Sequence, residues 1–185
     1  MKRRYTPHRP GSKTHPRISE HLVADLQSVT PSRDRSLEYR PCQVTLDSGS
    51  VVSCVYVVDA ESYLDMWGVW PEDDPSKQSL RIDEVASITE SPFRLPARFA
   101  SQIYSEGESG MGYTIFTVVF ADGTEQACSS GNAIDFIFYP EGKSATDVVG
   151  VVPHMGHDAS PKPSPQYHWC LFSPGLGANG SSDIA

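Results

Sequence analysis

Apolar residues recur at helical spacing in two segments of the chain. In the first segment four of them fall on one helical stripe, at spacings of four, four and three: Ile18, Leu22, Leu26 and Val29. Thr30-Pro31 ends this pattern. The second segment, residues 95–106, has Pro96 in its first turn and Gly107 as a stop. The pattern predicts one amphipathic helix within residues 18–29 and another over residues 95–106.

Runs rich in β-branched and aromatic residues on both sides of turn sequences predict two β-hairpins. Residues 42–46 pass through Asp47-Ser48-Gly49 into the strand 51–58. Residues 113–120 pass through Ala121-Asp122-Gly123 into the strand 124–129. We expect a turn and short strand within 80–89 and further strands at 132–139, 147–152 and 167–172.

The two hairpins correspond at five positions with a constant offset of 74. Val44, Leu46, Gly49, Ser50 and Cys54 match Val118, Phe120, Gly123, Thr124 and Cys128. Either the chain contains a weak internal repeat, or the match reflects what any two hairpins share. The fold class predicted is mostly β with two short helices, arranged as a small antiparallel barrel or sandwich. The strand spacing favours two SH3-like or Sm-like β units.

Composition divides the chain into four parts. Residues 1–17 form an expected flexible basic arm, and residues 18–40 hold the first helix and a linker. Residues 41–172 form the expected core, with sub-units 41–92 and 110–172 joined by the helix 95–106. Residues 173–185 are rich in Gly and Ser, and we expect them to form a flexible tail.

The net charge of −8 is distributed unevenly. Residues 1–40 carry 9 of the 15 Lys and Arg against 4 acidic residues, and residues 41–185 carry 6 against 19. An acidic body repels nucleic acid, so a nucleic-acid-binding function would depend on residues 2–17. The arm residues concerned include Lys2, Arg3, Arg4 and Arg9. The alternative is a solvated tail.

An acidic segment with two tryptophans is the strongest candidate for a binding surface. Its members are Asp65, Trp67, Trp70, Glu72, Asp73 and Asp74, with Asp59 and Glu61 just before them. Carboxylates speed encounters with a basic partner, and indoles supply desolvated contact area. Core packing of the tryptophans is the alternative. We expect a protein partner with a basic surface, and the sequence leaves the oligomeric state open.

Two weaker patterns point to catalysis. Ser109 lies among glycines, but Met111 stands where the nucleophile motif G-x-S-x-G requires Gly. In that motif the serine lies between a strand and a following helix, whereas here the predicted order is helix, loop, strand. A second pattern gathers four metal-ligand types: His154, His157, His168 and Cys170. Their spacing matches no standard zinc site, so we expect no metal or other cofactor. A small hydrolase using Ser109 or these ligands is the enzymatic alternative.

Hydropathy and cysteine usage bear on the location of the protein. No apolar run reaches the length of about 20 residues that a membrane helix needs, so we expect no membrane insertion. His8–Gly11 stand where a signal peptide would be apolar. The four cysteines form no C-x-x-C pair, as is usual for reduced thiols. The sequence thus predicts a cytoplasmic, non-enzymatic interaction module.

Overall fold

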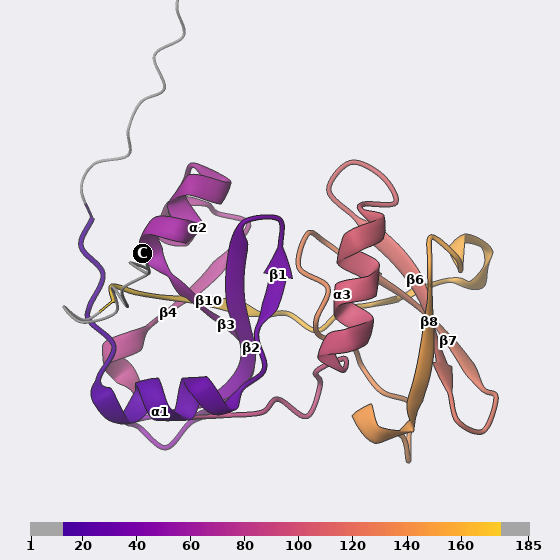
Figure 1. Cartoon of the computed structure of the whole chain (residues 1–185), viewed down its shortest axis with the longest axis horizontal. Helices are drawn as coiled ribbons and strands as arrows, with labels where there is room; N and C mark the ends of the chain where they lie inside the picture. The colour runs from indigo at the N-terminus through magenta and orange to yellow at the C-terminus, as the bar shows by residue number, and fades with distance from the viewer. Residues whose placement is uncertain (1–12, 175–185) are drawn as a thin grey trace, which may run out of the picture.

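The computed structural model describes residues 13–174, which form two β-sheets and three short α-helices (Figure 1). The helices are α1 (Glu20–Ser28), α2 (Ala60–Trp67) and α3 (Ala97–Glu106). Sheet 1 has the order β1 (Ser32–Asp34), β2 (Leu37–Leu46), β3 (Val51–Asp59), β10 (His168–Phe172) and β4 (Gln78–Arg81), with β5 (Val85–Thr89) also paired to β2. Sheet 2 has the order β8 (Val148–Pro153), β6 (Thr114–Phe120), β7 (Glu125–Ser130) and β9 (Lys162–Pro163). The predicted mostly β class is confirmed, but the two sheets do not close into a barrel.

Sheet 1 is mixed rather than antiparallel, because its strand β10 comes from the other end of the chain. β10 runs parallel to both of its neighbours, β3 and β4. Trp169 and Leu171 face one side of the sheet, and Cys170 faces the other. All three are almost completely buried, as is typical of a strand covered on both faces.

The two faces of sheet 1 support different clusters. Leu22 and Leu26 of α1 pack on Val55 and Val57 of β3. On the opposite face, Tyr56 begins an aromatic cluster that continues through Tyr39, Tyr63 and Trp169. The unbroken apolar run in β3 is therefore explained by burial on both sides.

Helix α3 lies between the two sheets (Figure 1). Phe99, Ala100 and Ile103 pack against sheet 2, where they meet Phe116 and Val151. The helix also contacts β1 of sheet 1. The helix expected over 95–106 is present as α3, which contacts both sheets.

The turns of the two predicted hairpins use the same hydrogen bonds. In the β2–β3 turn, the Leu46 amide donates to the Ser50 carbonyl at 2.8 Å, and Gly49 has φ 84°. In the β6–β7 turn, the Phe120 amide donates to the Thr124 carbonyl at 2.9 Å, and Gly123 has φ 83°. Only glycine adopts this left-handed conformation without strain, which is why each turn carries one.

Two segments differ from the sequence prediction. Helix α2 was not predicted, because no element was assigned between the strand expected over 51–58 and Trp67; Asp59 begins the helix and Gly68, with φ 70°, ends it. The strand expected over 132–139 is an extended segment with one isolated bridge, between Phe136 and Arg94. Its amides and carbonyls bond to residues 93–95 instead, including Leu95 N to Asp135 O at 2.7 Å.

The described part of the basic arm, residues 13–17, lies beside Ser173, near the C-terminal end of the described residues. The Ser173 amide donates to the Pro16 carbonyl, and the Ser173 hydroxyl donates to the His15 carbonyl, both at 2.9 Å. Arg17 and Ser173 form a parallel β-bridge. Residues 1–12 and 175–185, which hold most of the expected arm and tail, lie outside the described residues.

Candidate functional site

The acidic and aromatic residues singled out in the sequence do lie together, but the tryptophans are not exposed. We call the segment Trp70–Asp74 the acidic loop; its first turn is a 3-10 helix over Pro71–Asp73. The side chain of Trp70 is only 5% exposed and belongs to the aromatic cluster. Trp67, at the end of α2, is half-buried and packs on Trp169 with ring centroids 6.4 Å apart. The core-packing alternative therefore describes where both indoles lie.

Each of these two indoles carries a basic side chain on its face. The ring of His15 packs on Trp70 with centroids 4.7 Å apart. The Lys77 ammonium lies 4.5 Å from the centre of the Trp67 ring, close enough for a cation–π interaction. The two indoles thus form a surface on which the basic side chains of His15 and Lys77 pack.

All three carboxylates of the acidic loop pair with basic side chains of the same chain. Lys13 contacts Asp73, His15 Nε2 lies 3.4 Å from Glu72 Oε1, and Lys77 Nζ lies 3.5 Å from Asp74 Oδ2. Hydrogen bonds from Ser76 and the nearby Lys77 lower the pKa of Asp74, while burial lowers the pKa of Lys77. Asp65, by contrast, lies exposed on α2. Each carboxylate of the acidic loop therefore has a basic partner, and two of the three partners, Lys13 and His15, belong to the arm.

Ser109 and His154, which were predicted for two different kinds of site, form a hydrogen-bonded pair. Ser109 Oγ lies 2.9 Å from His154 Nδ1, and His154 Nε2 lies 3.3 Å from the Glu106 carbonyl oxygen. With the ring proton on Nε2, where it can be donated to this carbonyl, Nδ1 can accept from the serine hydroxyl, which also lies 3.2 Å from the Ile115 carbonyl oxygen. His154 also has φ 61°, an uncommon conformation for a residue with a side chain.

The surroundings of Ser109 supply a structural role as well. Its Oγ accepts the Ile115 amide at 2.8 Å, which fastens the glycine-rich loop to β6. The amides of Ser109 and Gly110 both donate to the Tyr113 carbonyl. These two donors are therefore not free to stabilise an oxyanion beside the serine.

The four suggested metal ligands are dispersed. His157 is exposed in a short turn, while Cys170 is buried against α1. His168 is half-buried in β10, and this burial lowers its pKa. Within residues 13–174 no three His, Cys, Asp or Glu side chains gather in an arrangement that would hold a metal ion.

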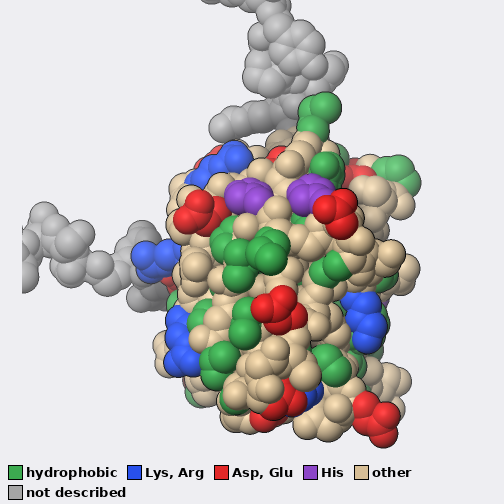
Figure 2. Space-filling model, turned by 90° about the vertical axis from the view of Figure 1, so that its right-hand side faces the viewer, with side chains coloured by type: hydrophobic (Ala, Val, Ile, Leu, Met, Phe, Trp, Pro, Cys, Tyr) green, Lys and Arg blue, Asp and Glu red, His purple; other side chains and the backbone are tan. Residues whose placement is uncertain are grey.

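The end of the molecule formed by sheet 2 is drawn in Figure 2. It shows hydrophobic side chains in small groups between charged ones, with two histidines side by side near the top of the view. The exposed apolar side chains around β8 are Val149, Val152 and Met155, which are 55%, 38% and 52% exposed.

The sequence analysis missed a buried polar cluster centred on Asp135. This side chain is fully buried; Ser32 donates to one carboxylate oxygen, and Tyr104 donates to the other at 2.6 Å. The Asp135 amide donates to the Tyr56 hydroxyl at 3.1 Å. Burial raises the pKa of Asp135, although Arg94, also buried, acts in the opposite direction. The cluster links sheet 1 to α3.

None of the described helices is long and apolar enough to cross a membrane. Comparisons with protein-family models, with curated proteins and with solved structures find no match.

Proposed function

We propose that the protein is a non-enzymatic interaction module that binds a basic segment of a partner protein on the acidic loop and the neighbouring Trp67. The observation that carries this proposal is the position of the arm: Lys13 and His15 rest on Asp73, Glu72 and Trp70. The chain's own basic segment occupies the place that a partner's segment would take.

Exchange between the arm and a partner is energetically feasible. Lys13 and Asp73 have side chains that are 44% and 47% exposed, and an exposed ion pair contributes only about 0.2–1 kcal/mol. A partner segment with several positive charges can form more ion pairs with Glu72 and Asp73 than Lys13 does. The energy of these pairs then exceeds the small energy of the Lys13–Asp73 pair that is broken. Such binding weakens as salt is added, because these carboxylates are exposed enough to be screened.

The test uses a labelled peptide with the sequence of residues 13–19, added to the full chain at low and high salt. We expect saturable binding that weakens with salt and is lost in the double variant Glu72→Gln/Asp73→Asn. Replacing Lys13 and His15 by Ala removes the competitor and is expected to tighten binding up to about fivefold, the equivalent of about 1 kcal/mol.

Asp122→Asn is the matched control, because Asp122 is an exposed, lysine-paired carboxylate in the β6–β7 turn. If it weakens peptide binding as much as the acidic-loop variant does, the interaction is general charge attraction and the proposal fails. Absence of any binding after the competitor has been removed would also contradict it.

A small hydrolase is the second candidate, and the 2.9 Å contact between Ser109 and His154 is what favours it. In this proposal His154 Nδ1 takes the proton of the Ser109 hydroxyl as the serine attacks an acyl carbon, and gives it to the leaving group as the bond between acyl carbon and leaving group breaks. Reaction of Ser109 with a fluorophosphonate probe, lost in His154→Ala but kept in Ser105→Ala, would support it, because the Ser105 hydroxyl bonds to the Gln102 carbonyl and not to His154. The bonds of the Ser109 and Gly110 amides to Tyr113 count against it.

The remaining alternatives stay predictions. Nucleic-acid binding by residues 2–17 depends on Lys2, Arg3, Arg4 and Arg9, which lie outside the described residues. A salt-dependent shift of a labelled oligonucleotide, lost when these four are changed to Ala, would establish it. The cytoplasmic location likewise stays a prediction.

We also propose that the β2–β3–β5 and β6–β7–β8 units form an internal repeat. Support comes from their third strands: Leu46 pairs with Val85 after a register shift, and Phe120 pairs with Val148 after a register shift at the same point. The residues that precede these strands form a 3-10 helix in both units. The SH3-like or Sm-like character of the units stays a prediction.

A further inference from the structure

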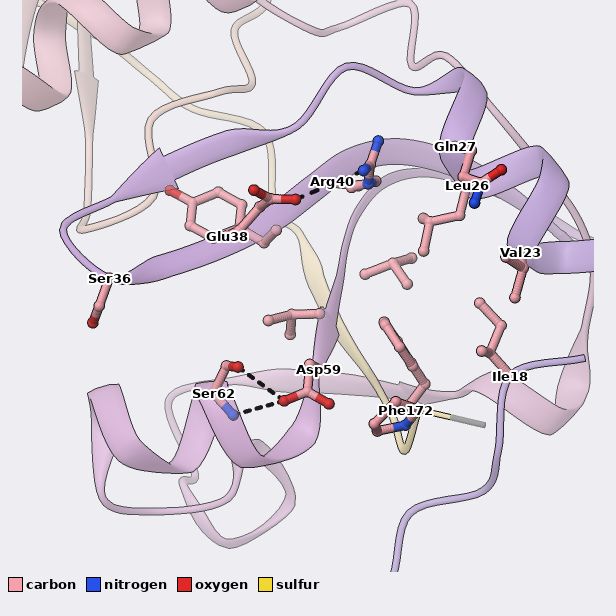
Figure 3. A pocket seen from close by; sticks show the side chains of 14 residues that line it. Ile18, Val23, Leu26, Gln27, Ser36, Glu38, Arg40, Asp59, Ser62 and Phe172 are labelled. Atoms are coloured by element: carbon pink, nitrogen blue, oxygen red, sulfur yellow. Dashed lines mark hydrogen bonds and ion pairs between the residues drawn. The ribbon is translucent and has the colours of Figure 1, made fainter. Parts of the chain in front are cut away.

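A cavity lies between α1, β2, β3 and the start of α2, away from the acidic loop (Figure 3). Its volume is about 360 Å³, near the lower end of the range for sites that hold small organic ligands. The walls are mainly apolar and come from Ile18, Val23, Leu26, Val58 and Phe172.

One polar group in this cavity lacks a partner. Asp59 Oδ1 accepts two hydrogen bonds at 2.9 Å, from the amide and the hydroxyl of Ser62. Asp59 Oδ2 is buried and accepts none from the described residues. Figure 3 shows this second oxygen directed away from Ser62, on the side where Phe172 lies. A buried carboxylate oxygen without a donor is costly, so the site is suited to a ligand that supplies one.

The charges around the cavity indicate whether a ligand that donates to Asp59 should be cationic or neutral. Arg40 donates to the Val29 carbonyl and lies 3.7 Å from Glu38 Oε1, while Arg33 holds the other oxygen of Glu38 at 2.7 Å, so both Arg40 and Glu38 already have partners within the chain. Both of these residues line the cavity together with Asp59. The carboxylate of Asp59 is left without a counter-charge, and a cationic donor complements it better than a neutral one.

We propose that this cavity binds a small primary amine with an apolar body. The ammonium group donates to Asp59 Oδ2, and the hydrocarbon or aromatic part packs against Val23, Leu26 and Phe172. The site uses neither the acidic loop nor Ser109, so it is independent of the function proposed above.

The test compares three probes of similar size on the full chain: n-hexylamine, 1-hexanol and hexanoate. Binding is followed by the amide shifts of residues 59–62 and 172 in two-dimensional NMR. We expect n-hexylamine to bind at least about tenfold more tightly than 1-hexanol, and hexanoate to bind least, since it places a second negative charge beside Asp59.

Two variants separate charge recognition from simple filling of an apolar hole. Asp59→Asn keeps a residue that starts helices well, so α2 is preserved, and the tenfold advantage of the amine should disappear while 1-hexanol binds as before. Val23→Phe fills the cavity and should block both probes. Asp65→Asn, on the exposed part of α2, is the control and should bind like the parent.

Several outcomes would overturn the proposal. They are equal binding of amine and alcohol by the parent, an undiminished preference for the amine in Asp59→Asn, and continued amine binding in Val23→Phe. Failure of n-hexylamine to bind at millimolar concentration would overturn it as well.

Discussion

Asp135 accepts a 2.6 Å hydrogen bond from the Tyr104 hydroxyl, and this contact joins the extended segment after β7 to helix α3. Ser32 of β1 donates to the other oxygen of the same carboxylate. One buried side chain therefore connects sheet 1, α3 and the segment between β7 and β8.

Replacing Asp135 by Ala is expected to lower the free energy of unfolding by about 2–4 kcal/mol. The change leaves the Ser32 and Tyr104 hydroxyls buried without their acceptor, and creates a small void. Urea unfolding at pH 7 measures the loss. Asp158→Ala, in an exposed turn, serves as the control and should change stability by less than about 0.5 kcal/mol. A loss equal to that of the control would mean that the cluster does not join the elements energetically.

The pH dependence of stability should carry a contribution from Asp122. Hydrogen bonds from Lys143 and Thr124 hold the pKa of this carboxyl well below its usual range. The contribution is therefore present above the ordinary aspartate pKa and is lost as the pH falls through the lower folded-state value. Asp122→Asn should be less stable than the parent at pH 7, and the difference should shrink at pH 3 and below. Denaturant unfolding at a series of pH values measures it, with the exposed Glu141→Gln as control.

The four cysteines should be unreactive in the folded protein. All four are free thiols with buried side chains, and burial raises the pKa of both Cys54 and Cys170 to about 12. Because the thiolate is the reactive form, iodoacetamide at pH 7.5 should add nothing to the native protein and four groups in denaturant. Intact-mass spectrometry counts the additions. Rapid labelling of any one cysteine under native conditions would show that its strand opens readily.

Gly156 should tolerate no side chain. A Cβ at this position would lie 2.8 Å from the Ala127 Cβ, and the residue has φ +112°. Gly142 has φ +74° but open space around it. An alanine at position 142 therefore reports the cost of backbone strain alone, without crowding. We expect Gly142→Ala to cost about 1 kcal/mol, and Gly156→Ala to cost about 1–3 kcal/mol more because the segment must move off sheet 2. Equal melting temperatures for the two variants would contradict this.

Local patterns predicted the elements whose cause is local. The two hairpins follow from runs of β-branched residues around Gly49 and Gly123, and the helix after Pro96 follows from its apolar stripe. Helix α2 was not predicted, although Asp59 and Gly68 stand where a helix cap and a helix stop are expected. A cap residue and a stop residue on either side of only eight residues are weak evidence for a helix.

The rest of the architecture depends on contacts between distant residues. Nothing in the neighbourhood of Asp135 predicts that its carboxylate is buried, because its partners Ser32 and Tyr104 lie 103 and 31 positions away. The pairing of Ser109 with His154 spans 45 positions and joins residues that the sequence suggested for different chemistries. The sequence also placed Trp70 on a contact surface, whereas the structure places it beneath His15.

The central position of β10 in sheet 1 has a consequence for synthesis of the chain. A ribosome makes β2, β3 and β4 early, yet within the sheet β3 and β4 are linked only through residues 168–172, which emerge after every strand of sheet 2. Elements α3 to β9 are continuous in sequence and have emerged by then. The C-terminal half is thus able to fold during translation, whereas the N-terminal half must stay open until the final strand inserts. Nascent chains stalled before residue 168 should accordingly expose the unpaired edges of β3 and β4 to chaperones.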